Sequence, residues 1–142
     1  MTDPAGIDVP RVTEWLQHNV AGATAPFAFT LIAGGHSNLT YAVDGADGRR
    51  LVLRRPPLGH VLASAHDMGR EHRIISALGA SPVPVAPALG FCDDVEVNGA
   101  PFYVMGFVDG LVLRDTASVE RLLARPARLR AGESIVDTLA AI

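Results

Sequence analysis

Lysine is absent from this 142-residue sequence, so all 12 of its basic side chains are arginines. Cysteine occurs once, at Cys92, which excludes a disulfide within the chain; we expect a small apolar side chain on or near a strand. The N-terminal stretch MTDPAGIDVPR has no basic region followed by an apolar core, which argues against a signal peptide. No run approaches the roughly 20 apolar residues of a membrane span. We therefore expect a cytoplasmic protein with no membrane partner.

Strong charge of either sign is also missing. The net charge is −3 and the pI is near 5.9, which gives no reason to expect a nucleic-acid partner. The chain is 49% hydrophobic with a mean hydropathy of +0.25, as expected of a folded globular protein of one domain, or one domain and the start of another. No metal site is expected, because the five histidines lack ligand spacing: His18, His36, His60, His66 and His72.

The first half of the chain reads as a helix, three strands and a second helix. Apolar residues at helical spacing predict a helix over 8–20, and strands are predicted over 27–33, 39–43 and 49–55, joined by glycine turns. Three short strands in succession predict an antiparallel meander. The next helix is predicted over 64–80, with Ser64 as its N-cap, Asp67 in a capping-box position and Gly79 as its stop.

The second half contains two more strands and then helices. The proline-rich segment 81–87 is expected to be an extended connector, followed by strands within 88–94 and 100–108 that a turn at Asn98-Gly99 joins. From residue 116 the pattern is helical, with a break at Pro126. The last helix carries an apolar stripe, and no stop signal follows it. That stripe comprises Leu129, Val136 and Leu139.

Two periodicities bring Arg54 and Glu71 toward each other. Alternation along the third strand places Arg54 on one face with Val52. Glu71 falls within the apolar stripe of the second helix, where a carboxylate is costly unless it is paired, and Arg54 is the leading candidate partner. Such a pair could point a guanidinium at phosphate oxygens. The residues alone are more simply explained by a Glu71 that tilts to solvent and an Arg54 that is a surface charge.

Two glycine-containing segments are open to two interpretations. The turn GGHSN, at residues 34–38, leaves room for close backbone approach to an anion, but it also suits an ordinary hairpin. The segment YVMGFVDG, at residues 103–110, is either a buried strand end or a connector whose backbone meets a flat heteroaromatic base.

Taken together and in order, these segments resemble the N-terminal lobe of the aminoglycoside-phosphotransferase-like kinases, which share the protein-kinase fold. Within that group the chain most resembles the phosphotransferase domain related to the one fused to some acyl-CoA dehydrogenases. The matching stretches span roughly residues 15–110: GGHSNLTY, DGRRLVLRRPPLG, SAHDMGREHRIISAL, VPVAPALGFCDD and PFYVMGFVDG.

The resemblance assigns roles to individual residues. It implies that the turn residues lie over the nucleotide phosphates. It also implies that Arg54 stands where most of these kinases have a phosphate-binding lysine, a position that is arginine in this subgroup, and that Glu71 pairs with Arg54. It also implies that Val52 and the interlobe hinge line the adenine pocket. The hinge has a glycine where a glutamate is more usual. The implied turn residues are Gly34, Gly35 and Ser37, and those of the hinge are Met105, Gly106 and Val108, where backbone groups of Gly106 and Val108 would bond adenine.

The catalytic segments of the resembling kinases do not occur in the sequence. Their base lies in an H-G-D-x-x-x-x-N loop and their metal-binding aspartate in a later D-[FW]-[ED] segment, and neither pattern is present. The resemblance implies ATP as the cofactor, with Mg²⁺ and a small-molecule acceptor only in an intact homologue. We expect a nucleotide-binding lobe that belongs to a phosphotransferase acting on a small-molecule hydroxyl and is inactive alone.

The expected fold is α+β: a kinase-like N-terminal lobe with a five-stranded antiparallel sheet and one packed helix, followed by the first helices of a missing C-lobe. The expected parts are an N-terminal helix and linker (1–26), the lobe with its hinge (27–110) and the start of the C-lobe (111–142). An alternative is a free-standing module that binds nucleotide or a partner. A non-kinase α+β domain is a third interpretation. The apolar stripe of the last helix also predicts self-association if it is exposed.

Overall fold

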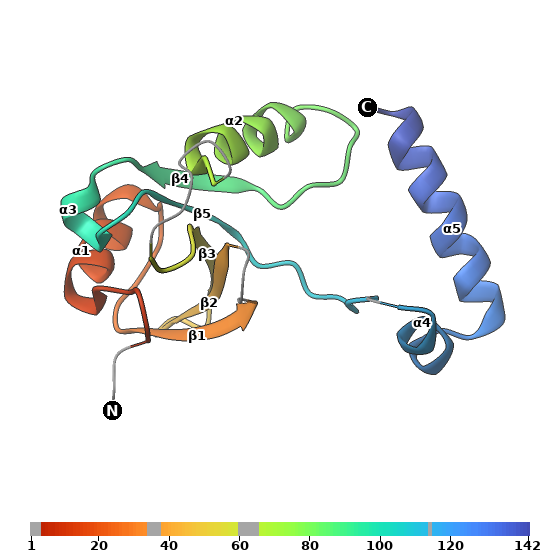
Figure 1. The fold of residues 1–142 in the computed structure, drawn as a ribbon, viewed down its shortest axis with the longest axis horizontal. Helices are drawn as coiled ribbons and strands as arrows, with labels where there is room; N and C mark the ends of the chain where they lie inside the picture. The colour runs from red at the N-terminus through yellow and green to blue at the C-terminus, as the bar shows by residue number, and fades with distance from the viewer. Residues whose placement is uncertain (1–3, 34–37, 60–65, 114) are drawn as a thin grey trace.

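A computed structural model describes residues 4–33, 38–59, 66–113 and 115–142 (Figure 1). Five strands form one sheet in the order β1-β2-β3-β5-β4, and every neighbouring pair is antiparallel. The predicted α+β architecture is therefore correct. The elements, in chain order, are α1 (Val9–Asn19), β1 (Phe27–Ala33), β2 (Leu39–Gly45), β3 (Arg50–Arg55), α2 (Met68–Leu78), β4 (Ala88–Cys92), α3 (Val95–Asn98), β5 (Phe102–Gly106), α4 (Thr116–Leu122) and α5 (Arg125–Ala140).

Side chains of the central strand β3 alternate between the two faces of the sheet. Leu51 and Leu53 lie in the hydrophobic core with Val12 and Leu16 of α1, as the period-2 alternation requires. Val52 and Arg54 point to the opposite face. On β5, Phe102 and Val104 join the core, whereas Tyr103 is paired with Arg54 and Met105 with Val52. One face of the sheet thus builds the core, and the other carries the residues predicted to bind nucleotide.

The second helix begins later than predicted. Asp67, rather than Ser64, is the N-cap of α2, and its carboxylate accepts the Arg70 amide at 2.8 Å. Asp67 was predicted three residues inside the helix, at the far side of a capping box. Ser64 itself lies outside the described residues. The helix ends at Gly79, as predicted.

A short helix occupies the predicted turn between β4 and β5. The four-residue α3 is capped by Asp94 and ends at Gly99, whose φ of +70° is a left-handed conformation that glycine adopts without strain. The turn prediction at Asn98-Gly99 is correct in place, and both strands are shorter than predicted. Cys92 is buried at the end of β4, as expected.

The C-terminal helices lie away from the sheet in Figure 1. The break between α4 and α5 falls at residues 123–124, and Pro126 belongs to the first turn of α5, where a proline costs no hydrogen bond. It was predicted to break the helix. The apolar stripe on α5 is exposed: Leu129, Val136 and Leu139 are each about two-thirds accessible, at 65%, 65% and 66%. No helix among the described residues has the length and hydrophobicity to cross a bilayer.

Candidate nucleotide site

Arg54 and Glu71 form an ion pair between β3 and α2. Arg54 Nε lies 2.8 Å from Glu71 Oε2, and each side chain is 29% exposed. The strand alternation places Arg54 on this face and the helical stripe places Glu71 opposite it, so the two sequence patterns meet as predicted. In the structure Glu71 therefore contacts Arg54 and does not point into solvent.

Two further donors surround the Glu71 carboxylate. The Asn38 side-chain amide donates to Oε1 at 2.8 Å, and the Tyr103 hydroxyl donates to Oε2 at 3.1 Å. Burial, with the nearby Glu71 charge, raises the pKa of Tyr103 to about 12, so the hydroxyl keeps its proton and acts as a donor. Arg54 in turn donates from Nη1 to Thr40 Oγ1 at 3.1 Å.

Asn38, Tyr103 and His66 are not among the site residues predicted from the sequence. His66 Nδ1 lies 2.6 Å from Asn38 Oδ1, which places a histidine directly behind the amide that holds Glu71. A signal for Tyr103 was present, because alternation along β5 puts it on the same face as Met105, a predicted hinge residue. Asn38 stood in the quoted turn motif, but no local pattern pointed it at a residue 33 positions away.

A cavity of about 320 Å³ opens on the same face of the sheet. It is lined by Ile32, Thr40, Val52, Ala86, Val112 and the stretch from Met105 to Gly110. The predicted adenine-pocket residue Val52 and the predicted hinge residues therefore lie together. Thr40 belongs both to this cavity and to the hydrogen bonds of Arg54, so the ion pair stands at the edge of the cavity.

The hinge backbone is fixed by its neighbours. The Gly106 amide donates to the Pro87 carbonyl at 2.9 Å, and a Cβ at Gly106 would lie 2.7 Å from Pro87 Cγ. A side chain at this position would thus collide with a rigid ring, which accounts for glycine here. Arg50 covers the ring of Phe107, with its guanidinium carbon 3.9 Å from the ring centroid.

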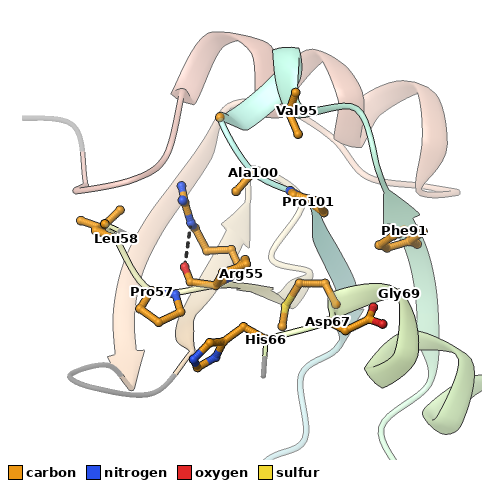
Figure 2. Close-up of a pocket in the computed structure, with 14 residues that line it drawn as sticks. Arg55, Pro57, Leu58, His66, Asp67, Gly69, Phe91, Val95, Ala100 and Pro101 are labelled. Carbon is orange, nitrogen blue, oxygen red and sulfur yellow. Dashed lines mark hydrogen bonds between the residues drawn. The ribbon is translucent and has the colours of Figure 1, made fainter. Parts of the chain in front are cut away.

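A larger cavity of about 590 Å³ lies between the end of β3, the start of α2 and the β4–β5 connection. Figure 2 shows Arg55, His66 and Phe91 among the side chains around it. None of the described residues that sequence analysis assigned to the nucleotide site lines this cavity. The predicted phosphate-turn residues Gly34, Gly35 and Ser37 lie outside the described part of the chain. Within that part, no cluster of three or more His, Cys, Asp or Glu residues could hold a metal ion.

Comparison with known proteins extends these observations. The profile of the phosphotransferase enzyme family matches residues 28–142. Acyl-CoA dehydrogenase family member 10 of Mus musculus is 42% identical over 93 residues, which cover 66% of this chain and 9% of that protein. Acyl-CoA dehydrogenase family member 11 of Gallus gallus is 37% identical over 108 residues, covering 76% of this chain and 13% of that protein. The chain therefore spans about a tenth of the length of these curated relatives.

A solved structure shares the fold. It is a provisionally named aminoglycoside phosphotransferase from Ralstonia eutropha, with 32% sequence identity and a TM-score of 0.63. The match covers 76% of this chain and 30% of the Ralstonia protein. The kinase-like lobe that the sequence predicted is thus confirmed by both comparisons. On the matched residues and the shared fold, this chain belongs to the phosphotransferase enzyme family.

Proposed function

We propose that this chain is the ATP-binding lobe of a phosphotransferase that transfers the γ-phosphoryl group to a small-molecule hydroxyl. The observation that carries the proposal is the position of Arg54, which Glu71 and Thr40 hold at the edge of the cavity that Val52 and the hinge line. A base-sized apolar cavity next to a fixed guanidinium suits a nucleotide, whose two ends are a flat ring and an anion.

The cavity fits the base in size and polarity. Its volume of about 320 Å³ falls within the range of roughly 300–1,000 Å³ typical of small-molecule sites. The Gly106 amide is already bonded to Pro87, so we assign the contact with the adenine amino group to the Gly106 carbonyl, and the contact with a ring nitrogen to the Val108 amide. Since both contacts use backbone atoms, a glycine in the hinge does not weaken the assignment.

The phosphate end relies on arginine chemistry. Arg54 commits Nε to Glu71 and one Nη1 hydrogen to Thr40, which leaves Nη2 to meet phosphate oxygens. A planar guanidinium can contact two oxygens at once, unlike a lysine ammonium. Gly34, Gly35 and Ser37 are proposed to close over the phosphates.

Turnover is not expected from these residues alone. The described residues contain no metal cluster, and the sequence contains no catalytic-loop motif, so we propose binding without phosphoryl transfer for this chain. We propose that the chain divides into an N-terminal helix and linker (residues 1–26), the lobe with its hinge (27–110) and the start of a C-lobe (111–142). The exposed stripe of α5 favours burial against a further protein surface, either the remaining lobe of a longer family member or a second copy.

The test is ATP binding to the 142-residue protein, measured by calorimetry. Arg54→Ala should weaken binding at least about tenfold, since a hydrogen bond to a charged group contributes roughly 1.5–3 kcal/mol. Arg130→Ala, at an exposed position on α5, is the matched control and should bind as the wild type does. Absence of ATP binding by the wild type, or equal affinity in Arg54→Ala, would overturn the proposal.

A further inference from the structure

Glu71 is held by donors from three separate segments. Arg54 donates from β3 and Tyr103 from β5. Asn38, the residue just before β2, is the third donor. Asn38 and Tyr103 are almost fully buried, at 5% and 4% exposure, so neither bond can readily be replaced by water. The ring of Tyr103 is in turn packed near that of His72 on α2, with centroids 6.2 Å apart. Both carboxylate oxygens of Glu71 are therefore fixed in direction as well as paired.

The orientation of the Asn38 amide is determined by its two neighbours. Its nitrogen faces Glu71 Oε1 at 2.8 Å and its oxygen faces His66 Nδ1 at 2.6 Å. The reversed amide would place a carbonyl oxygen against a carboxylate, which is repulsive. Because Asn38 Oδ1 can only accept, His66 must donate from Nδ1. A neutral His66 is therefore held in the Nδ1–H form, whichever form it would adopt in water.

We propose that Asn38, His66 and Tyr103 are positioning residues that fix Glu71, and that His66 does so as the Nδ1–H tautomer. In this chain of bonds, which we call the relay, His66 donates to Asn38, Asn38 donates to Glu71, and Arg54 donates to Glu71 from the other side. His66 lies immediately before the N-cap of α2, and Asn38 immediately before β2. The relay therefore ties the start of the helix to the start of the strand and to the guanidinium.

The consequence for binding rests on the proposed function. With Glu71 fixed, Arg54 keeps Nη2 directed to the phosphate position, and less conformational entropy is lost when ATP binds. Without the amide of Asn38, Glu71 and Arg54 can still pair, but the pair can rotate. The relay is thus expected to act on ATP affinity through Glu71, with no contact of its own to the nucleotide.

The first experiment reads the tautomer directly and needs no nucleotide. Nitrogen-15 NMR of the histidine rings, in buffer alkaline enough for an ordinary histidine to be neutral, distinguishes a protonated Nδ1 from a protonated Nε2. His66 should show a protonated Nδ1, and Asn38→Leu should abolish this preference. A protonated Nε2 at His66 in the wild type would overturn the proposal. If Asn38→Leu fails to fold, the wild-type spectrum alone decides.

The second experiment uses matched substitutions and ATP affinity. Asn38→Asp keeps the size of the side chain and the acceptor for His66, but removes the donor to Glu71; ATP should bind about tenfold more weakly. His66→Asn places an amide nitrogen at the same number of bonds from Cβ as Nδ1 and should retain affinity. His66→Gln places it one bond further and should not. Equal affinities in the two His66 variants would contradict the relay.

A double-mutant cycle identifies Glu71 as the point of action. In a Glu71→Gln background, Asn38→Asp should weaken ATP binding no further, because the residue through which it acts is already changed. Additive losses would show that Asn38 acts elsewhere and would overturn the proposal. If the wild type does not bind ATP at all, the proposed function fails, whereas the NMR measurement still decides on the relay.

Discussion

Arg54 and Arg55 are adjacent, chemically identical and differently used. Arg54 is partly exposed, pairs with Glu71 and stands beside the candidate nucleotide cavity. Arg55 is only 6% exposed and donates to three backbone carbonyls, those of Gly6, Pro56 and Asn98. The dashed line at Arg55 in Figure 2 marks one of these bonds. Burial lowers the pKa of Arg55, with the nearby Tyr41 opposing that effect.

The difference follows from which face of β3 each residue occupies. The Arg55 face carries Leu51 and Leu53 and builds the core, so its arginine joins the N-terminal segment to α3. The opposite face carries the cavity that Val52 and Thr40 line, and there Arg54 pairs with Glu71 and Thr40 instead of with backbone carbonyls. One strand thus carries a buried structural arginine on one face and the arginine of the proposed site on the other, so the face rather than the residue type distinguishes them.

The largest loss of unfolding free energy is expected from a substitution on the core face of β3. Leu53 is fully buried, so Leu53→Ala should lower the free energy of unfolding by about 3 kcal/mol through lost burial and a residual cavity. Leu129→Ala, the same change at a 65% exposed position of α5, should stay within about 0.5 kcal/mol. Urea unfolding measures both. Similar losses in the two variants would mean that Leu53 does not lie in the core.

Substitutions of the two arginines should differ by a smaller amount of unfolding free energy. Arg55→Met keeps the aliphatic stem but leaves buried carbonyls without donors, and should cost about 2 kcal/mol of unfolding free energy. Arg54→Met should cost about 1 kcal/mol or less, because its ion pair is partly exposed.

Affinity should show the opposite order. Arg54→Met should lose most ATP binding, whereas folded Arg55→Met should retain it. Calorimetric titration beside urea unfolding separates the two effects. The distinction between the faces would fail if Arg54→Met lost as much unfolding free energy as ATP affinity. It would also fail if Arg55→Met lost neither.

The alternation that distinguishes these faces was available from the sequence. Strand patterns and glycine turns predicted all five strands. The strand alternation and the helical stripe made Arg54 the leading candidate partner of Glu71 and left a solvent-exposed Glu71 open; the family resemblance then implied the contact. The alternation and the stripe are local periodicities, which depend on nearest neighbours along the chain. Family resemblance added the hinge residues, which the structure brings to one cavity with Val52.

Features set by distant contacts could not be predicted in this way. Ser64 and Asp67 are both good helix caps, and the choice of Asp67 accompanies the burial of Met68 and the bond between His66 and Asn38. The four-residue α3 is too short to show a period. The buried role of Arg55 depends on carbonyls 43 and 49 positions away, which no local pattern encodes.

The two tyrosines of the chain provide the finest comparison, because one lies on each face. Tyr41 is paired with Leu53 on the core face, and burial raises its pKa, although Arg55 nearby opposes the shift. Tyr103 is paired with Arg54 on the other face, and burial, with the Glu71 charge, raises its pKa to about 12. In both cases the folded state holds the phenolic proton more tightly than the unfolded chain does.

Stability should therefore fall as the pH rises above 10. There the unfolded chain releases these protons and the folded protein does not, so the unfolding free energy drops by at most about 1.4 kcal/mol per pH unit for each tyrosine, until its folded pKa is passed. Tyr103→Phe should remove the larger share of this slope, because the pKa of Tyr103 is raised to about 12. Urea unfolding at a series of pH values measures the slope in the wild type, Tyr103→Phe and Tyr41→Phe. A Tyr103→Phe slope equal to that of the wild type would show that the hydroxyl ionises as freely in the fold as in the unfolded chain, and that Glu71 does not face a permanent donor from β5.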